Sequence, residues 1–173
     1  MAEWLLLATL AMAPGSTDMR LGMELAPWLA VNDGVMGGVS RGRMVATEDG
    51  LRFEGELSLA NNGGFASVRR VLEADLSAAT SVRLEVRGDG RTYQFRLRLD
   101  QRYDGVAWRA DFATSGEWQT IDLPFDEFVP VFRGRRVPEA GPVVAADIGQ
   151  VGFLLADKTA GAFALDIRSI EFR

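Results

Sequence analysis

Three successive segments near the middle of the chain alternate apolar and polar residues with a period of two. Their apolar positions are Val82, Leu84 and Val86, then Tyr93, Phe95, Leu97 and Leu99, then Val106, Trp108, Ala110 and Phe112. This period predicts β-strands that place one face in a core and the other face in water. It does not fit amphipathic helices, whose apolar residues recur every three or four positions.

Further short segments with strand-like patterns are separated by turn residues along the rest of the chain. The last of them changes phase, because Ile170 and Phe172 are out of step with the apolar residues before them, and this predicts a β-bulge near Arg168 and Ser169. No segment shows a convincing helical period. The pattern therefore predicts an all-β fold, either a sandwich or a barrel. The additional expected strands span 51–59, 65–70, 118–123, 151–155 and 163–172.

Two glycine-containing segments are the most distinctive loops of the sequence. The first, 32–40, reads N-D-G-V-M-G-G-V-S, and the second, 61–65, reads N-N-G-G-F. Gly and Asn tolerate positive φ, so both segments are expected to turn sharply and to lie together at one lip of the sandwich.

A second candidate site depends on how segments 82–87 and 91–99 pair. If they form a hairpin around Gly88-Asp89-Gly90, their polar side chains share one solvated face with those of the next strand. That face is either a solvated surface with weak ion pairs or a polar groove for a sugar, a carboxylate or a partner loop. Its candidate residues are Arg83, Arg87, Gln94, Arg96, Arg98 and Arg109, with Trp118 expected on an outer face.

The residue types that are missing restrict the possible chemistry. The 173 residues include no His and no Cys, which excludes an imidazole base, a thiol nucleophile and a zinc–thiolate site. A net charge of −5 argues against a general nucleic-acid binder. The spacing of the aspartates matches no calcium loop, and Glu54 with Glu56 is more typical of a strand surface than of a catalytic pair. We expect no catalytic residue, no metal and no cofactor.

The N-terminal segment leaves two interpretations open. Residues 4–13 form an apolar run that is too short to span a bilayer and resembles the apolar part of a signal peptide, although no basic residue precedes it. We therefore expect an N-terminal extension, 1–22, before a single β-sandwich domain, 23–173. Lys158 is the only lysine, a bias typical of a high-GC bacterial genome. A cytoplasmic bacterial protein is expected, or an exported one if 4–13 belongs to a signal peptide.

Several blocks of the sequence occur together in one known family. V-N-D-G-V-M-G-G-V-S, N-N-G-G-F-A-S-V-R, R-G-D-G-R-T-Y-Q-F-R-L-R, W-Q-T-I-D-L-P-F, F-R-G-R and I-G-Q-V-G-F-L-L-A-D-K occur in family order. The chain thus resembles the complex I intermediate-associated protein family. The resemblance implies a jelly-roll β-sandwich of the galactose-binding-domain-like type. It also implies that the candidate binding residues of the two loops are the signature positions Asn32, Asp33, Met36, Gly37, Gly38, Ser40, Asn62, Gly63, Gly64, Phe65 and Arg69. Further signature positions are Gly34, Ser67, Gly88, Asp89, Gly90, Tyr93, Pro124, Phe125, Phe132, Arg133, Gly134, Asp157 and Lys158.

The resemblance also implies a role, because the mitochondrial member of the family assists assembly of NADH:ubiquinone oxidoreductase and is not itself a redox enzyme. We therefore expect a non-enzymatic binding module, an assembly or chaperone-like factor with a protein partner. The alternative is a carbohydrate-binding module in which Trp118 or Tyr93 stacks on a sugar. An enzyme that uses only Asp and Glu is a third hypothesis.

Overall fold

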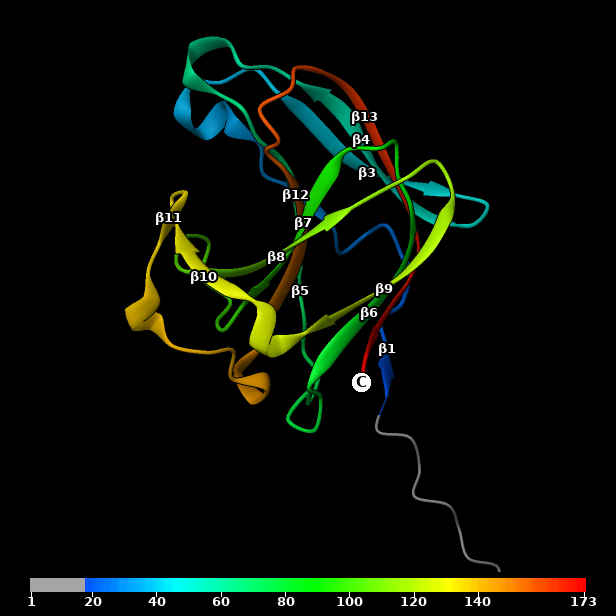
Figure 1. Cartoon of the computed structure of the whole chain (residues 1–173), viewed down its shortest axis with the longest axis vertical. Helices are drawn as coiled ribbons and strands as arrows, with labels where there is room; N and C mark the ends of the chain where they lie inside the picture. The colour runs from blue at the N-terminus through cyan, green and yellow to red at the C-terminus, as the bar shows by residue number, and fades with distance from the viewer. Residues whose placement is uncertain (1–17) are drawn as a thin grey trace, which may run out of the picture.

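The computed structural model describes residues 18–173, which form two antiparallel β-sheets (Figure 1). One sheet has the order β3-β4-β13-β6-β9, with β1 also paired to β13, and the other has the order β11-β10-β8-β7-β12-β5-β2. Only short 3₁₀ turns interrupt the strands within this part of the chain. The strands are β1 (Met19–Arg20), β2 (Leu29–Ala30), β3 (Arg41–Thr47), β4 (Gly50–Leu57), β5 (Ala66–Val71), β6 (Ser81–Arg87), β7 (Thr92–Arg98), β8 (Ala107–Ala113), β9 (Trp118–Pro124), β10 (Val129–Phe132), β11 (Arg135–Arg136), β12 (Gln150–Leu155) and β13 (Gly161–Phe172).

The core lies between the two sheets and is rich in aromatic side chains. Phe53 of β4 packs edge-on against Phe163 of β13, with ring centroids 4.9 Å apart. Phe95 of β7 packs in the same way against Phe153 of β12, at 5.2 Å. Tyr93 links the two pairs, because its ring contacts Phe53 and also Phe112, which in turn contacts Phe153. These contacts between apolar inner faces are those expected of a sandwich. The predicted all-β jelly-roll fold is confirmed.

The predicted hairpin between 82–87 and 91–99 is wrong. β6 pairs with β9 and β13 in the six-stranded sheet, whereas β7 pairs with β8 and β12 in the seven-stranded sheet. The Gly88-Asp89-Gly90 segment therefore crosses from one sheet to the other. Asp89 fixes this crossing, because its Oδ2 accepts hydrogen bonds from the Tyr93 hydroxyl and from the backbone N–H of Ala164 in β13.

The bulge predicted in the last strand is present. The register of β13 against β6 shifts between Ile167 and Ser169, which allows Ile167, Ile170 and Phe172 all to be buried. Three strands were not predicted. β3 has small and polar residues without a clear period, and β10 and β11 are short strands inside the long connection 125–141.

The N-terminal residues of the described part belong to the six-stranded sheet. Met19 and Arg20 of β1 pair with Phe172 and Glu171 of β13, so β1 lies beside the C-terminal end of the chain (Figure 1). The apolar run 4–13, and with it the possible signal peptide, lies outside the described residues, and the proposed domain boundary stays a prediction. Within 18–173, no helix has the length and hydropathy needed to cross a membrane.

Candidate functional site: a basic groove and its lip

The two glycine-containing loops meet at the buried carboxylate of Asp33. One oxygen of Asp33 accepts the N–H of Ser40 at 2.9 Å, and the other accepts the N–H of Gly64 at 2.7 Å and that of Phe65 at 3.3 Å. Burial opposes the charge on Asp33, but the hydrogen bonds from Ser40, Gly64 and Phe65 outweigh it and hold the pKa of this carboxyl below its usual value. One ionised side chain therefore joins residues that lie more than thirty positions apart.

The glycines of both loops make room for this carboxylate. A Cβ atom on Gly38 would lie 2.4 Å from the Asp33 Cγ, and one on Gly63 would lie 2.5 Å from the Asp33 Oδ2. Gly37 and Gly64 have positive φ values of 89° and 142° and turn the chain on each side. The expected proximity of the two loops is therefore observed, and Figure 1 shows them together at the upper left of the view.

Asn32 and Ser67 attach the same loop to β3 and β5. The Asn32 side chain donates to the carbonyl oxygen of Gly42 at 3.1 Å and accepts the N–H of Ser67 at 3.1 Å. The Ser67 hydroxyl donates to the carbonyl oxygen of Val31. These bonds hold the first loop at the end of the seven-stranded sheet. Val35 and Met36 at its tip remain well exposed.

The seven-stranded sheet carries a groove of about 920 Å³ on the face opposite the core. Six of the residues that line the groove are cationic, and Asp104 is the only acidic residue in this lining. Val35, Met36 and Phe65 form an apolar end of the groove at the lip. We call this feature the basic groove and define it by its cations, Arg69, Arg96, Arg98, Arg109, Arg133 and Lys158.

Strand register aligns three of these arginines in a row across the sheet. Arg109 of β8 is opposite Arg96 of β7, Arg96 is opposite Gly152 of β12, and Gly152 is opposite Arg69 of β5. Neighbouring strands are about 4.8 Å apart, so the row from β8 to β5 spans about 14 Å. Gly152 leaves the sheet surface open between Arg96 and Arg69, because it has no side chain there.

The outer faces of the two sheets differ in how their arginines are neutralised. On the six-stranded sheet, Asp166 binds Arg52 at 2.6 Å and Arg87 at 2.9 Å, and Arg83 binds Asp122 at 2.6 Å. In the basic groove, by contrast, four of the six cations form no ion pair within residues 18–173. They are Arg69, Arg96, Arg98 and Lys158.

The unpaired arginines bind neutral oxygens instead. Arg96 donates two hydrogen bonds to the Oε1 atom of Gln94, Arg98 donates to the carbonyl oxygen of Gly105, and Arg69 donates to that of Tyr103. Burial and the nearby charges of Arg98 and Arg109 lower the pKa of Arg96 to about 10, and burial also lowers the pKa of Arg98. Arg96 and Arg98 remain charged at neutral pH, although burial and the neighbouring arginines disfavour their charge.

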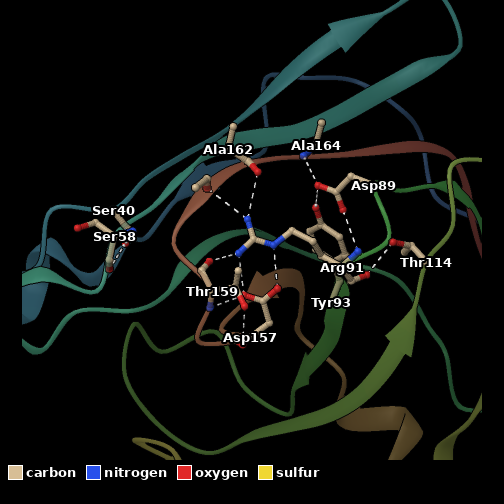
Figure 2. Close-up of polar contacts among 11 residues, drawn as sticks. Ser40, Ser58, Asp89, Arg91, Tyr93, Thr114, Asp157, Thr159, Ala162 and Ala164 are labelled. Carbon is tan, nitrogen blue, oxygen red and sulfur yellow. Dashed lines mark hydrogen bonds and ion pairs between the residues drawn. The ribbon is translucent and has the colours of Figure 1, made fainter.

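Arg91 holds the loop that brings Lys158 to the groove (Figure 2). Its guanidinium binds both carboxylate oxygens of Asp157, at 2.8 and 2.7 Å, and donates to the carbonyl oxygens of Thr159, Gly161 and Ala162. The same interaction holds the pKa of Asp157 below its usual value, even though burial opposes this. Arg91 was not among the predicted site residues, although it lies within the block R-G-D-G-R-T-Y-Q-F-R-L-R.

The structure separates the residues of the predicted polar face. Gln94, Arg96, Arg98 and Arg109 do lie together in the groove. Three of the loop candidates, Met36, Phe65 and Arg69, join them. The corrected pairing places Arg83 and Arg87 on the outer face of the other sheet, as the strand register requires.

Neither aromatic proposed for sugar stacking is free to stack. Trp118 lies on the outer face as expected, but the guanidiniums of Arg168 and Arg87 cover its ring, at 3.8 and 4.9 Å from its centroid. Tyr93 is fully buried. Burial and the nearby Asp89 raise the pKa of its hydroxyl.

One of the two candidate catalytic carboxylates, Glu54, has a structural partner. Glu54 binds Arg43 at 3.1 Å on the surface of the six-stranded sheet. Within the described part of the chain, no three His, Cys, Asp or Glu side chains are grouped so as to hold a metal ion.

The fold places the chain in the class of jelly-roll β-sandwiches. A family 11 carbohydrate-binding module from Clostridium thermocellum, in complex with a β-1,3-1,4-mixed-linked tetrasaccharide, has the same fold, with a TM-score of 0.67. The match covers 90% of this chain and 94% of that one, at 18% identity. A family 29 carbohydrate-binding module gives a TM-score of 0.53 at 11% identity, with 91% of this chain and 92% of that chain covered.

Sequence comparison identifies the family. The sequence model of the complex I intermediate-associated protein 30 family matches residues 17–167, and the chain belongs to this family. The mitochondrial complex I intermediate-associated protein 30 of Mus musculus is 36% identical over 103 residues, which are 57% of this chain and 31% of that protein. The probable counterpart from Caenorhabditis elegans is 33% identical over 90 residues, which are 49% of this chain and 26% of that protein.

These relatives overturn the expected localisation, and they match this chain over only part of their own length. Their names place them in mitochondria, which contradicts the expected cytoplasmic bacterial localisation. The bacterial part of that expectation rested on the scarcity of lysine, and the cytoplasmic part on the incomplete signal-peptide pattern of 4–13. The match spans less than a third of the length of either relative.

Proposed function

We propose that this chain is a non-catalytic binding module that holds a protein partner in the basic groove during assembly of a larger complex. Membership of the complex I intermediate-associated protein 30 family supports the assembly role, and its relatives make subunits of NADH:ubiquinone oxidoreductase the first candidate partners. The observation that carries the proposal is the groove itself, which combines unpaired arginines with exposed apolar side chains. Such a surface binds a ligand through charge and apolar contact and needs no proton-transferring residue.

Carbohydrate binding is the competing function. The fold is shared with carbohydrate-binding modules, and Tyr103, which is 61% exposed, lies in the groove. However, the Arg69 guanidinium already lies over the Tyr103 ring, 4.7 Å from its centroid. Trp118 is covered in the same way and Tyr93 is buried, so none of these three rings is open for a sugar to stack on.

The test combines gene deletion with affinity purification in the source cells. Loss of the chain is expected to reduce fully assembled NADH:ubiquinone oxidoreductase on native gels and to increase its subassemblies. The tagged chain is expected to recover subunits of that enzyme after cross-linking. Normal assembly in the deletion strain, together with selective binding of the purified chain on a glycan array, would support the carbohydrate function and reject the assembly role.

A further inference from the structure

The basic groove holds positive charges that no carboxylate of residues 18–173 neutralises. Most arginines of the six-stranded sheet have a carboxylate partner, whereas Arg96 lies at the centre of the row with two like charges beside it and no ion pair within residues 18–173. The chain as a whole is acidic, with a net charge of −5, so this cluster is not a consequence of overall composition. Sequences depart from local electrostatic balance in this way mainly where a ligand restores it.

The ligand that would restore the balance carries several negative groups in a line. Arg109, Arg96 and Arg69 form a row of about 14 Å across three strand spacings. An extended peptide presents every second side chain on one side, and the first and fifth residues lie about 13 Å apart. Three alternate carboxylates on such a peptide would therefore span the row, and guanidinium forks bind carboxylates with two hydrogen bonds each.

The lip indicates what kind of polyanion fits. Val35 and Met36 at the apolar end of the groove are each 63% exposed, and Phe65 lies beside them. Uronate chains and nucleic-acid backbones carry negative charges but have no aliphatic side chains to cover these residues. A peptide can supply both chemistries, with acidic residues over the arginine row and an apolar residue against the lip.

We propose that the basic groove binds an extended acidic segment of the partner protein, with alternate carboxylates on Arg109, Arg96 and Arg69 and an apolar residue against Val35 and Met36. This proposal rests on the proposed function and names the chemistry of its partner. Arg98 and Lys158 add positive charge beside the row. The Arg91–Asp157 interaction keeps the Lys158 loop in place.

The direct test is fluorescence anisotropy with a labelled nine-residue peptide that has glutamate at three alternate positions followed by leucine and methionine. We expect saturable binding that weakens as the ionic strength rises. The same peptide with glutamine in place of glutamate is the first control and is expected not to bind. An oligogalacturonate and a single-stranded oligonucleotide test the two other polyanion classes.

Matched variants connect the binding to the arginine row. Arg96→Gln is expected to weaken peptide binding about tenfold or more, because it removes one charge-assisted interaction. Arg43→Gln makes the same charge change on the other sheet, where the side chain is exposed and paired with Glu54, and is expected to leave binding unchanged. Arg96→Gln should also keep or raise the melting temperature, because it removes a buried charge that its neighbours repel.

Several results would overturn the inference. These are binding of neither peptide, equal binding of both peptides, binding of only the oligogalacturonate or oligonucleotide, or an Arg96→Gln variant that melts lower and still binds the acidic peptide. The proposed function is judged separately. If enzyme subunits co-purify equally with the wild type and Arg96→Gln, the groove assignment fails and the assembly role stands. If the peptide binds but assembly is normal without the chain, the assembly role fails and the groove assignment stands.

Discussion

At the scale of the residue, Asp33 explains why the two signature loops contain so many glycines. Its carboxylate accepts three backbone N–H groups, and side chains on Gly38 or Gly63 would collide with it. The sequence could predict sharp turns from Gly and Asn, and it could group the two loops as neighbours. It could not predict the buried carboxylate between them, because this contact joins positions more than thirty residues apart.

Replacing Asp33 by Asn should therefore destabilise the protein. The amide keeps the size of the side chain but loses the negative charge, and its NH₂ group would face a backbone N–H that needs an acceptor. We expect a loss of about 2–3 kcal/mol in the free energy of unfolding. Urea denaturation measures it, with the exposed Asp126→Asn as the matched control. Equal stabilities for the two variants would show that the Asp33 charge does not hold the loops.

At the scale of the element, the alternating pattern predicted most strands and misplaced one connection. A period of two identifies a half-buried strand equally well in either sheet, so it cannot decide whether β6 and β7 pair. The phase change in β13, in contrast, is a local signal and correctly indicated the bulge. The row of Arg109, Arg96 and Arg69 depends on pairings between β5, β12, β7 and β8, which no local pattern specifies.

The loop between β12 and β13 depends on the fork of Arg91. Arg91→Lys keeps the charge but cannot bind both oxygens of Asp157 and several carbonyl groups at once. We expect a loss of about 2–3 kcal/mol and faster amide hydrogen exchange at 157–161 than in the strands around them.

Arg83→Lys provides the comparison for this variant. Arg83 also binds its partner, Asp122, through two nitrogens, but the pair is exposed, with side-chain exposures of 38% and 51% against 13% and 16% for Arg91 and Asp157. Arg83→Lys should leave the free energy of unfolding close to that of the wild type, because solvent screens an exposed ion pair. Similar losses in the two variants would mean that burial does not strengthen the Arg91 interaction.

At the scale of the whole molecule, the charges are sorted between two faces. Most arginines of the six-stranded sheet are paired with carboxylates, while the seven-stranded sheet presents Arg69, Arg96, Arg98 and Arg109 in the basic groove. Net charge and composition gave no sign of this division. The composition did restrict how the protein titrates, because a chain without His has no imidazole that changes charge between pH 5 and 8.

The stability of the whole molecule should therefore be nearly constant from about pH 6 to 8 and should fall in acid. The pKa values of Asp33, Asp157 and Asp166 lie below their usual range in the folded state, because hydrogen bonds and arginine partners outweigh the effect of burial. A carboxyl with a lowered folded pKa binds a proton more readily in the unfolded chain. Its contribution is complete above about pH 4–5 and is lost as the pH falls through the folded pKa.

The variant Asp166→Asn separates the stability lost on protonation of this one carboxyl from general acid unfolding. Asp166 binds Arg52 and Arg87 and is almost buried, so the variant should be clearly less stable than the wild type at pH 7. Because the wild-type carboxylate loses its advantage on protonation, the difference between the two proteins should shrink as the pH falls towards about 3. Urea denaturation at a series of pH values measures both curves. Parallel curves over the acidic range would show that Asp166 does not contribute to the acid sensitivity of the fold.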